Sequence, residues 1–213
     1  MEDYKTKVRE LIKINEDEAL VYLEDYISRN FHDFDAIIAC ALLAQKAPFD
    51  DFITAIKLLQ DLLNIDKYNV KALLLKAYVE NIHLGEIDYS TFNAINYCLN
   101  LNNYNFYSIQ LLVLQAQYYQ DKDKIKYIET LQKSVNLDFK ASYNFLLLGR
   151  ATNNTMYLEQ ALNNVEFIYT IENVTDIDNI DFDEFINEHI RGTKISFINY
   201  EAMKQELNVA RNC

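Results

Sequence analysis

A period of thirty-six residues restricts the fold of this chain more than any other feature of its sequence. Leu23, Leu59, Ile95 and Leu131 follow one another at that spacing. Four further columns keep the same step: Ala19, Ala55, Thr91 and Tyr127; Ile27, Leu63, Leu99 and Val135; Ile37, Leu73, Ile109 and Phe145; Ala41, Ala77, Val113 and Gly149. A fixed period of about 20 to 50 residues is typical of stacked repeats, because each unit needs its neighbours to bury its apolar face. The sequence therefore predicts a repeat array.

Helices are the expected content of each repeat. The chain has only three Gly and one Pro, which leaves little turn chemistry for a sheet protein. Apolar residues recur at helical spacing between short breaks rich in Asn and Asp, which suit turns and helix starts. The breaks define helical hairpins at about 1–30, 34–65, 70–101, 106–137 and 142–172.

The repeats resemble the tetratricopeptide repeat family. Phe145, Leu148 and Gly149 match the bulky, Leu and Gly positions of that family's first helix, and Ala161 matches the small position of its second helix. The segments at 63–66 and 135–138 look like the family's repeat ending, although Lys67, Asn103 and Phe139 stand where its proline is expected. The resemblance implies an all-α, right-handed α-solenoid of about five helical hairpins.

The last part of the chain departs from the period. Residues 176–184 are acidic, and a last helix is expected from Ile195 to Val209. A terminal unit with a polar outer face keeps a repeat array soluble. We therefore expect repeats over about 1–172 and a C-terminal capping helix within 180–213, in a single domain spanning 1–213.

Net charge limits the classes of partner. The formal charge of −12 disfavours nucleic acid, which requires a basic patch, and it equally disfavours an anionic membrane surface. The same reasoning argues against a pentatricopeptide-type RNA reader, whose period is similar. A basic protein partner fits this charge, although acidity also serves solubility alone.

The cysteines and the N-terminus indicate a reducing compartment. Cys40, Cys98 and Cys213 are an odd number without a metal-ligand spacing, so neither a disulfide framework nor a zinc site is expected. Cys40 and Cys98 fall in helical columns and should be buried, free thiols. The N-terminus has no apolar signal segment, and no stretch is long enough to span a membrane. We expect a cytoplasmic protein.

Candidate chemical sites are weak. An EF-hand loop beginning at Asp176 fails at Ile180, Asp181 and Asn187, so a solvated acidic turn is the better interpretation. The three histidines, His32, His83 and His189, lack a ligand spacing. No nucleophile or phosphate-loop motif is present. No catalytic residue, metal or cofactor is therefore expected, and an enzyme with an unrecognised pocket is kept as an alternative.

The surface expected to carry function is the inner face that the first helix of each hairpin presents in tetratricopeptide arrays. Matching that family's groove positions onto this sequence gives five rows, which we call the inner-face rows: Asp35, Lys71, Tyr107 and Tyr143; Ile38, Leu74, Gln110 and Leu146; Leu42, Tyr78, Leu114 and Arg150; Gln45, Asn81, Gln117 and Asn153; Lys46, Ile82, Tyr118 and Asn154. Tyrosine is favoured at interfaces because it offers a large contact area at a small entropic cost. Packing of some of these tyrosines between helices is the alternative.

The resulting hypothesis is a non-enzymatic protein–protein interaction module that binds a peptide or helix in a concave groove. The partner-binding residues expected from the rows are Tyr78, Asn81, Tyr107, Gln110, Gln117, Tyr118, Tyr143 and Arg150. The role is that of an adaptor or chaperone. The alternative is an immunity-type inhibitor that uses its negative charge to meet a basic toxin and to speed association.

Overall fold

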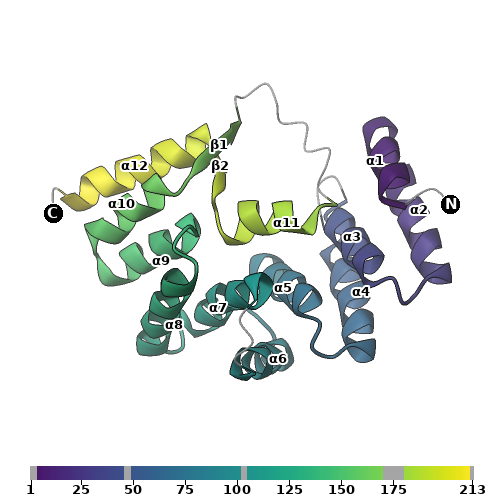
Figure 1. Cartoon of the computed structure of the whole chain (residues 1–213), viewed down its shortest axis with the longest axis horizontal. Helices are drawn as coiled ribbons and strands as arrows, with labels where there is room; N and C mark the ends of the chain where they lie inside the picture. Colours follow the sequence, from purple (N-terminus) through teal and green to yellow (C-terminus); the bar gives the residue numbers. More distant parts are fainter. Residues whose placement is uncertain (1–3, 46–48, 102–104, 170–179, 212–213) are drawn as a thin grey trace. The chain divides into compact units, whose positions relative to one another are not determined.

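The computed structural model describes residues 4–45, 49–101, 105–169 and 180–211, and they are mainly helical (Figure 1). The α-helices are α1 (Tyr4–Ile14), α2 (Glu16–Arg29), α3 (Phe34–Ala44), α4 (Phe52–Ile65), α5 (Val70–Val79), α6 (Tyr89–Asn100), α7 (Phe106–Tyr119), α8 (Lys124–Leu137), α9 (Ser142–Thr152), α10 (Thr155–Asn163), α11 (Phe182–Phe185) and α12 (Phe197–Arg211). Two helices continue into a π-helical turn: η1 (Glu80–Leu84) follows α5, and η2 (Ile186–Ile190) follows α11. The strands β1 (Glu166–Tyr169) and β2 (Lys194–Ser196) complete the described elements.

The helix boundaries follow the Asn and Asp residues at the predicted breaks. Helices α3, α4, α5 and α8 begin after Asp33, Asp51, Asn69 and Asp123, whose side chains each accept a hydrogen bond from a backbone N–H of the first helical turn. Such caps satisfy amide groups that have no partner within the helix. Helices next to each other in the sequence pack against each other within each predicted hairpin. The prediction of a helical protein is therefore confirmed.

The thirty-six-residue columns form the core. Leu23, Leu59, Ile95 and Leu131 are each fully buried, as predicted. The column beside it places Ala19 and Ala55 at no exposure, with Thr91 and Tyr127 also buried. Each buried Leu or Ile contributes roughly 1.5–3 kcal/mol to the free energy of unfolding. The thirty-six-residue period thus corresponds to one packing contact that recurs from repeat to repeat.

Gly149 permits close packing of α9 against α10 in the last hairpin. A Cβ at this position would lie 2.6 Å from Leu158 Cδ2 and 3.1 Å from the Leu158 backbone nitrogen. Helices α9 and α10 therefore approach at a distance that a larger side chain would prevent. The same column holds Ala41, Ala77 and Val113, all buried and all small or slender.

The contacts of the chain fall into two compact units, and the single domain over 1–213 stays a prediction. Unit 1 comprises Met1–Asn102 with Asp176–Phe182, and unit 2 comprises Asn103–Thr175 with Asp183–Cys213. In unit 1, Ile180 joins an apolar cluster with Val8, Leu23 and Cys40. Residues from beyond the last hairpin thus complete the core of unit 1.

The end of the last hairpin differs from the prediction. Helix α10 ends at Asn163, and 166–169 form strand β1 where a helix was expected up to 172. Strand β1 pairs in parallel with β2, with Glu166 opposite Lys194. The β-branched and aromatic residues of Val165 to Tyr169 favour an extended backbone, and β2 provides its hydrogen-bonding partner. Helical periodicity alone could not reveal this pairing.

Helix α12 packs on α10, beside the ribbon formed by β1 and β2 (Figure 1). It begins at Phe197, two residues later than predicted, because Ile195 belongs to β2. The predicted terminal helix therefore exists and covers the second helix of the last hairpin. Among the residues described, no helix has both the length and the apolar character needed to cross a membrane.

Candidate binding surface on the first helices of the hairpins

The eight residues predicted to bind a partner are divided between the two units. Tyr78 and Asn81 lie on α5 and η1 in unit 1, and both are half-buried. The other six lie in unit 2, with Tyr107, Gln110, Gln117 and Tyr118 on α7 and Tyr143 and Arg150 on α9. Gln117 Nε2 donates a hydrogen bond to the Tyr143 hydroxyl at 3.5 Å, so the structure brings α7 and α9 together at these positions.

The aliphatic members of the inner-face rows belong to the core, except Ile82, which is 57% exposed. Ile38, Leu42, Leu74 and Leu114 are each 2% exposed or less, and Leu146 is 8% exposed. Gln110, one of the predicted partner-binding residues, is only 1% exposed. Its buried side chain contacts this chain itself, through a hydrogen bond from Nε2 to Asp138 Oδ2 at 2.9 Å. The tyrosines Tyr78, Tyr107, Tyr118 and Tyr143 are half-buried.

The C-terminal segment, residues 183–211, contacts three of the predicted residues in unit 2. The Tyr107 hydroxyl donates to Asp183 Oδ1 at 2.7 Å. The Tyr143 backbone N–H donates to the carbonyl of Arg191 at 2.8 Å. Arg150 donates to both carboxylate oxygens of Glu206, at 2.8 and 2.6 Å. The chain therefore places its own segment on part of the surface that the sequence assigned to a partner.

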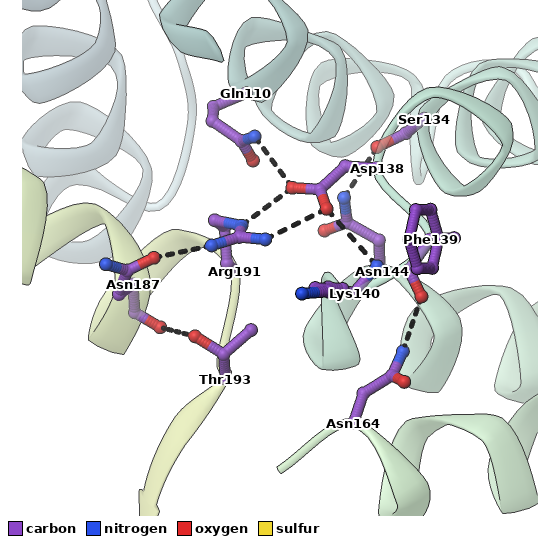
Figure 2. A network of polar contacts seen from close by, with 10 residues as sticks. All are labelled: Gln110, Ser134, Asp138, Phe139, Lys140, Asn144, Asn164, Asn187, Arg191 and Thr193. Carbon is purple, nitrogen blue, oxygen red and sulfur yellow. Dashed lines mark hydrogen bonds and ion pairs between the residues drawn. The ribbon is translucent and has the colours of Figure 1, made fainter. Parts of the chain in front are cut away.

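Arg191 is the centre of this contact (Figure 2). Its Nε and Nη2 donate to the two carboxylate oxygens of Asp138 at 2.7 and 2.9 Å, and Nη1 donates to Asn187 Oδ1 at 2.6 Å. The guanidinium carbon lies 5.4 Å from the centre of the Phe106 ring. We call Phe106, Gln110, Asp138, Asn187 and Arg191 the Arg191 clamp.

The electrostatics of the clamp favour its charged form. Burial alone would raise the pKa of Asp138, but hydrogen bonds from Arg191 and Gln110, with the positive charge of Arg191, hold that pKa below its ordinary value. Two parallel N–H to oxygen bonds give an arginine–carboxylate pair both strength and a fixed orientation. The clamp thus fixes the position of the η2 turn against α7 and the start of α9.

Gly192 allows the backbone after Arg191 to lie against α9. Its φ is +58°, a conformation that L side chains rarely adopt, and an added Cβ would lie 2.8 Å from Tyr143 Cβ. Thr193 closes the turn, because its N–H and its hydroxyl both donate to the carbonyl of Asn187, at 2.9 and 3.1 Å. Glycine is required here by both conformation and space.

The clamp residues Asp138, Asn187 and Arg191 were not predicted from the sequence. Asp138 was interpreted only as part of a turn, and it does end α8 as a C-cap residue. Arg191 lies fifty-three positions later in the sequence, outside the repeat. Its one local signal is the neighbouring Gly192, which marks a backbone turn in a chain with only three glycines.

In unit 1, an open hollow lies on α3 and α5, which are the first helices of their hairpins, as α7 and α9 are in unit 2. Its volume is about 600 Å³, and it lies at the N-terminal turns of α3 and α5. The lining residues are His32, Asp33, Phe34, Asp35, Ile38, Asn69, Val70 and Lys71. Lys71 Nζ donates to Asp35 Oδ1 at 3.0 Å across it. Asp35, Lys71 and Ile38 belong to the inner-face rows, so the hollow lies on the predicted face.

A second buried polar cluster joins α5, η1 and α6 in unit 1. Lys76 and Glu80 form an ion pair, and they are 4% and 2% exposed. Lys76 Nζ also donates to the Thr91 hydroxyl at 2.6 Å, and that hydroxyl donates to Glu80 Oε1 at 3.2 Å. The backbone N–H of Asp88 donates to Glu80 Oε2 at 3.1 Å. These contacts compensate two buried charges and hold the start of α6 against α5.

The thiols of Cys40 and Cys98 lie where their helical columns predict packing. Cys40 and Cys98 are buried and free, as expected, and Cys213 lies outside the described residues. Burial, with a contribution from the charge of Glu24, raises the pKa of Cys40 to about 12. His83 stacks on Phe52 with ring centres 4.9 Å apart. Within the described ranges, no group of three or more His, Cys, Asp and Glu residues is placed to hold a metal ion. The start of the acidic run, 176–179, lies outside these ranges.

Comparison with known proteins identifies no relative. No protein-family model matches the sequence, and no characterised protein or solved structure is significantly similar to it.

Proposed function

We propose that this chain is a non-enzymatic protein-interaction module that binds a peptide or helix of a partner on the inner-face rows. In this proposal the hairpins form a right-handed, tetratricopeptide-like solenoid with α12 as its cap. The protein acts in the cytoplasm as an adaptor or chaperone.

The observation that supports the proposal most is the contact between the C-terminal segment and unit 2. There, the first helices α7 and α9 hold the C-terminal segment through the Tyr107 hydroxyl, the Tyr143 backbone amide and the ion pair of Arg150 with Glu206. These are the kinds of contact that the inner-face rows offer to a partner. A face that holds one helical segment of its own chain has the chemistry to hold a segment of another.

The resolved shifts in carboxyl pKa support a structural use of those groups. Hydrogen bonds at helix starts lower the pKa values of Asp51, Asp88 and Asp123, and a hydrogen bond from Arg150 lowers that of Glu206. A general acid at neutral pH requires the opposite shift. These four carboxylates are thus suited to capping and ion pairing.

The experiment uses Tyr78 and Asn81, because alanine at Tyr107 also removes the hydroxyl that donates to Asp183, and alanine at Tyr143 removes the hydroxyl that accepts from Gln117. A partner is first identified by pulldown and mass spectrometry, and its affinity for the purified chain is then measured by calorimetry. We expect Tyr78→Ala to weaken binding by about 2 kcal/mol, as is typical of an aromatic interface anchor. Asn81→Ala should weaken binding by about 1 kcal/mol.

Asn64→Ala is the matched control, since Asn64 is exposed on the second helix of its hairpin, away from the rows. It should leave the affinity unchanged, and all three variants should keep the circular dichroism signal and melting temperature. Asp61→Lys reverses a charge on α4, a second helix of a hairpin. If this variant fails to bind while Tyr78→Ala and Asn81→Ala bind normally, the partner binds the second helices and not the inner-face rows.

The charge distribution favours the inhibitor role as a second candidate. Unit 1 carries ten basic and twenty acidic residues, a formal charge of −10, whereas unit 2 carries ten basic and twelve acidic residues, a formal charge of −2. Such a concentration of negative charge speeds association with a basic protein. An immunity-type inhibitor of a basic toxin predicts an association rate that falls steeply with salt, measurable by stopped flow.

A further inference from the structure

The turn that ends α4 in unit 1 has the same backbone structure as the turn that ends α8 in unit 2. Asp66 and Asp138 are seventy-two residues apart, two repeat periods, and both are C-cap residues. Their φ and ψ angles are −123° and 85° in one case and −128° and 83° in the other. The next first helices begin at Val70 and Ser142, again seventy-two residues apart. Positions around the two turns therefore correspond one to one.

The hollow of unit 1 corresponds to the place that Arg191 occupies in unit 2. In unit 2, Phe106 lies beside the Arg191 guanidinium, Gln110 donates to the Asp138 carboxylate that Arg191 binds, and the Tyr143 N–H donates to the Arg191 carbonyl. At a spacing of seventy-two residues they correspond to Phe34, Ile38 and Lys71. All three corresponding residues line the hollow. In unit 2 this position holds a guanidinium group between an aromatic ring and a carboxylate, while in unit 1 the same position is an open concavity.

The charges around the hollow match a cation. Asp33 and Asp35 line it, and Asn69, another lining residue, donates to Asp66 Oδ2 at 3.1 Å. Lys71 is the one lysine or arginine among the lining residues and is paired with Asp35. Two lining carboxylates, Asp33 and Asp35, thus accompany one ammonium group within a unit whose formal charge is −10. The Phe34 ring supplies the apolar surface that Phe106 supplies to Arg191.

From this correspondence we infer that the hollow at the starts of α3 and α5 binds an arginine side chain from a basic segment of a partner protein. The inference rests on the proposed function and specifies the chemistry of the partner. Arginine is favoured over lysine because a planar guanidinium can stack on Phe34 while it bonds to a carboxylate, as Arg191 does on Phe106. The partner's arginine competes with Lys71 for Asp35.

The test uses the full chain and two fluorescent peptides, hexa-arginine and hexa-lysine, at physiological salt. We expect hexa-arginine to bind about three times more tightly than hexa-lysine by fluorescence anisotropy. Asp35→Asn should weaken hexa-arginine binding about threefold, and Phe34→Leu should remove the preference for arginine. Lys71→Met should tighten binding, because it removes a competing cation.

Asp17→Asn is the charge-matched control. Asp17 is exposed in the first turn of α2, whereas the hollow adjoins the turn that follows the end of that helix, about 20 Å away. Its substitution should change the affinity for hexa-arginine by much less than Asp35→Asn does. Equal effects of the two substitutions, or equal affinities for the two peptides, would mean general attraction to an acidic surface and would overturn the inference.

The two proposals fail separately. If hexa-arginine shows no site preference but Tyr78→Ala weakens binding of the natural partner, the inner face binds partners and the hollow does not select arginine. If the hollow selects arginine but Tyr78→Ala and Asn81→Ala bind the natural partner normally, the arginine site remains and the proposed function on the inner-face rows fails.

Discussion

Arg191 donates two parallel hydrogen bonds to Asp138, the residue that ends α8. The exposed fractions of the two side chains are 14% and 11%, so the pair is largely shielded from water and salt. It joins the C-terminal segment to the hairpins of unit 2. Its removal should therefore be visible in the stability of unit 2 and in the dependence of that stability on pH.

Asp138→Asn should lower the free energy of unfolding at pH 7 by about 1–3 kcal/mol, because it removes a charge-assisted pair. The pKa of Asp138 is lower in the folded chain than in the unfolded chain, so at pH values between these two pKa values the folded state binds fewer protons. The stabilisation is present above the unfolded pKa of about 3.9 and is lost as pH falls through the folded pKa. Urea unfolding at pH 7 and pH 3 should show a smaller acid loss for Asp138→Asn than for the unmodified chain. Equal losses would contradict this role.

Lys76→Met should destabilise unit 1 by about 3–5 kcal/mol, because it leaves the Glu80 carboxylate buried without its cation. The double substitution Lys76→Met with Glu80→Met removes both charges and should recover much of that loss. A double-mutant cycle measured by urea unfolding provides the comparison. If the double variant is as unstable as the sum of the two single variants, the pair is not coupled in this way.

Ile95→Asp should lower the free energy of unfolding by about 4 kcal/mol or more, since it places an unpaired charge at a fully buried position. Ile53→Asp is the control, because Ile53 is 69% exposed on α4, and it should change stability by less than about 0.5 kcal/mol. Thermal unfolding followed by circular dichroism measures both. If Ile95→Asp and Ile53→Asp lower the free energy of unfolding by similar amounts, the column that contains Ile95 is not part of the core.

Gly149→Ala should cost about 1–3 kcal/mol, because the new methyl group overlaps Leu158. Combining it with Leu158→Ala tests the cause, since the smaller side chain makes room for the methyl group. The double variant should then be more stable than the sum of the two single losses predicts. If urea unfolding shows that the two losses of stability simply add, the contact between position 149 and Leu158 does not limit the packing of α9 on α10.

Cys40 should react with a thiol reagent far more slowly in the folded chain than in urea. Burial raises the pKa of its thiol to about 12, so almost no thiolate exists at pH 8, and the side chain has no exposed surface. Labelling followed by peptide mass spectrometry distinguishes Cys40 from the other cysteines. Rapid labelling of Cys40 without denaturant would contradict the buried position.

The repeating parts of the structure could be predicted from the sequence because they rest on short-range physics. The burial of Leu23, Leu59, Ile95 and Leu131 follows from one contact repeated at a fixed spacing. The starts of α3 and α5 follow from the local capping chemistry of Asp33 and Asn69. Both kinds of signal are visible within one or two helical turns.

The Arg191 clamp and the β ribbon could not be predicted, because each joins a segment of the repeats to a distant segment that lies beyond the period. Asp138 looks like an ordinary turn residue until β2 and Gly192 bring Arg191 to it. Gln110 was assigned to a partner because its column faces inward, and its burial became visible only with the structure. The prediction of partner-binding residues on the inner-face rows remains to be tested.

The parallel pairing of β1 with β2 has a consequence during synthesis. Strand β1 is complete at Tyr169, but its backbone partner ends at Ser196, twenty-seven residues later. At about 5–20 residues per second, the ribosome needs roughly 1–5 seconds to add those residues. Until both segments have been made, 166–169 cannot form this pairing, and an unpaired strand edge is the kind of surface that joins other chains. We therefore expect slower translation between these two strands to increase aggregation of the newly made protein.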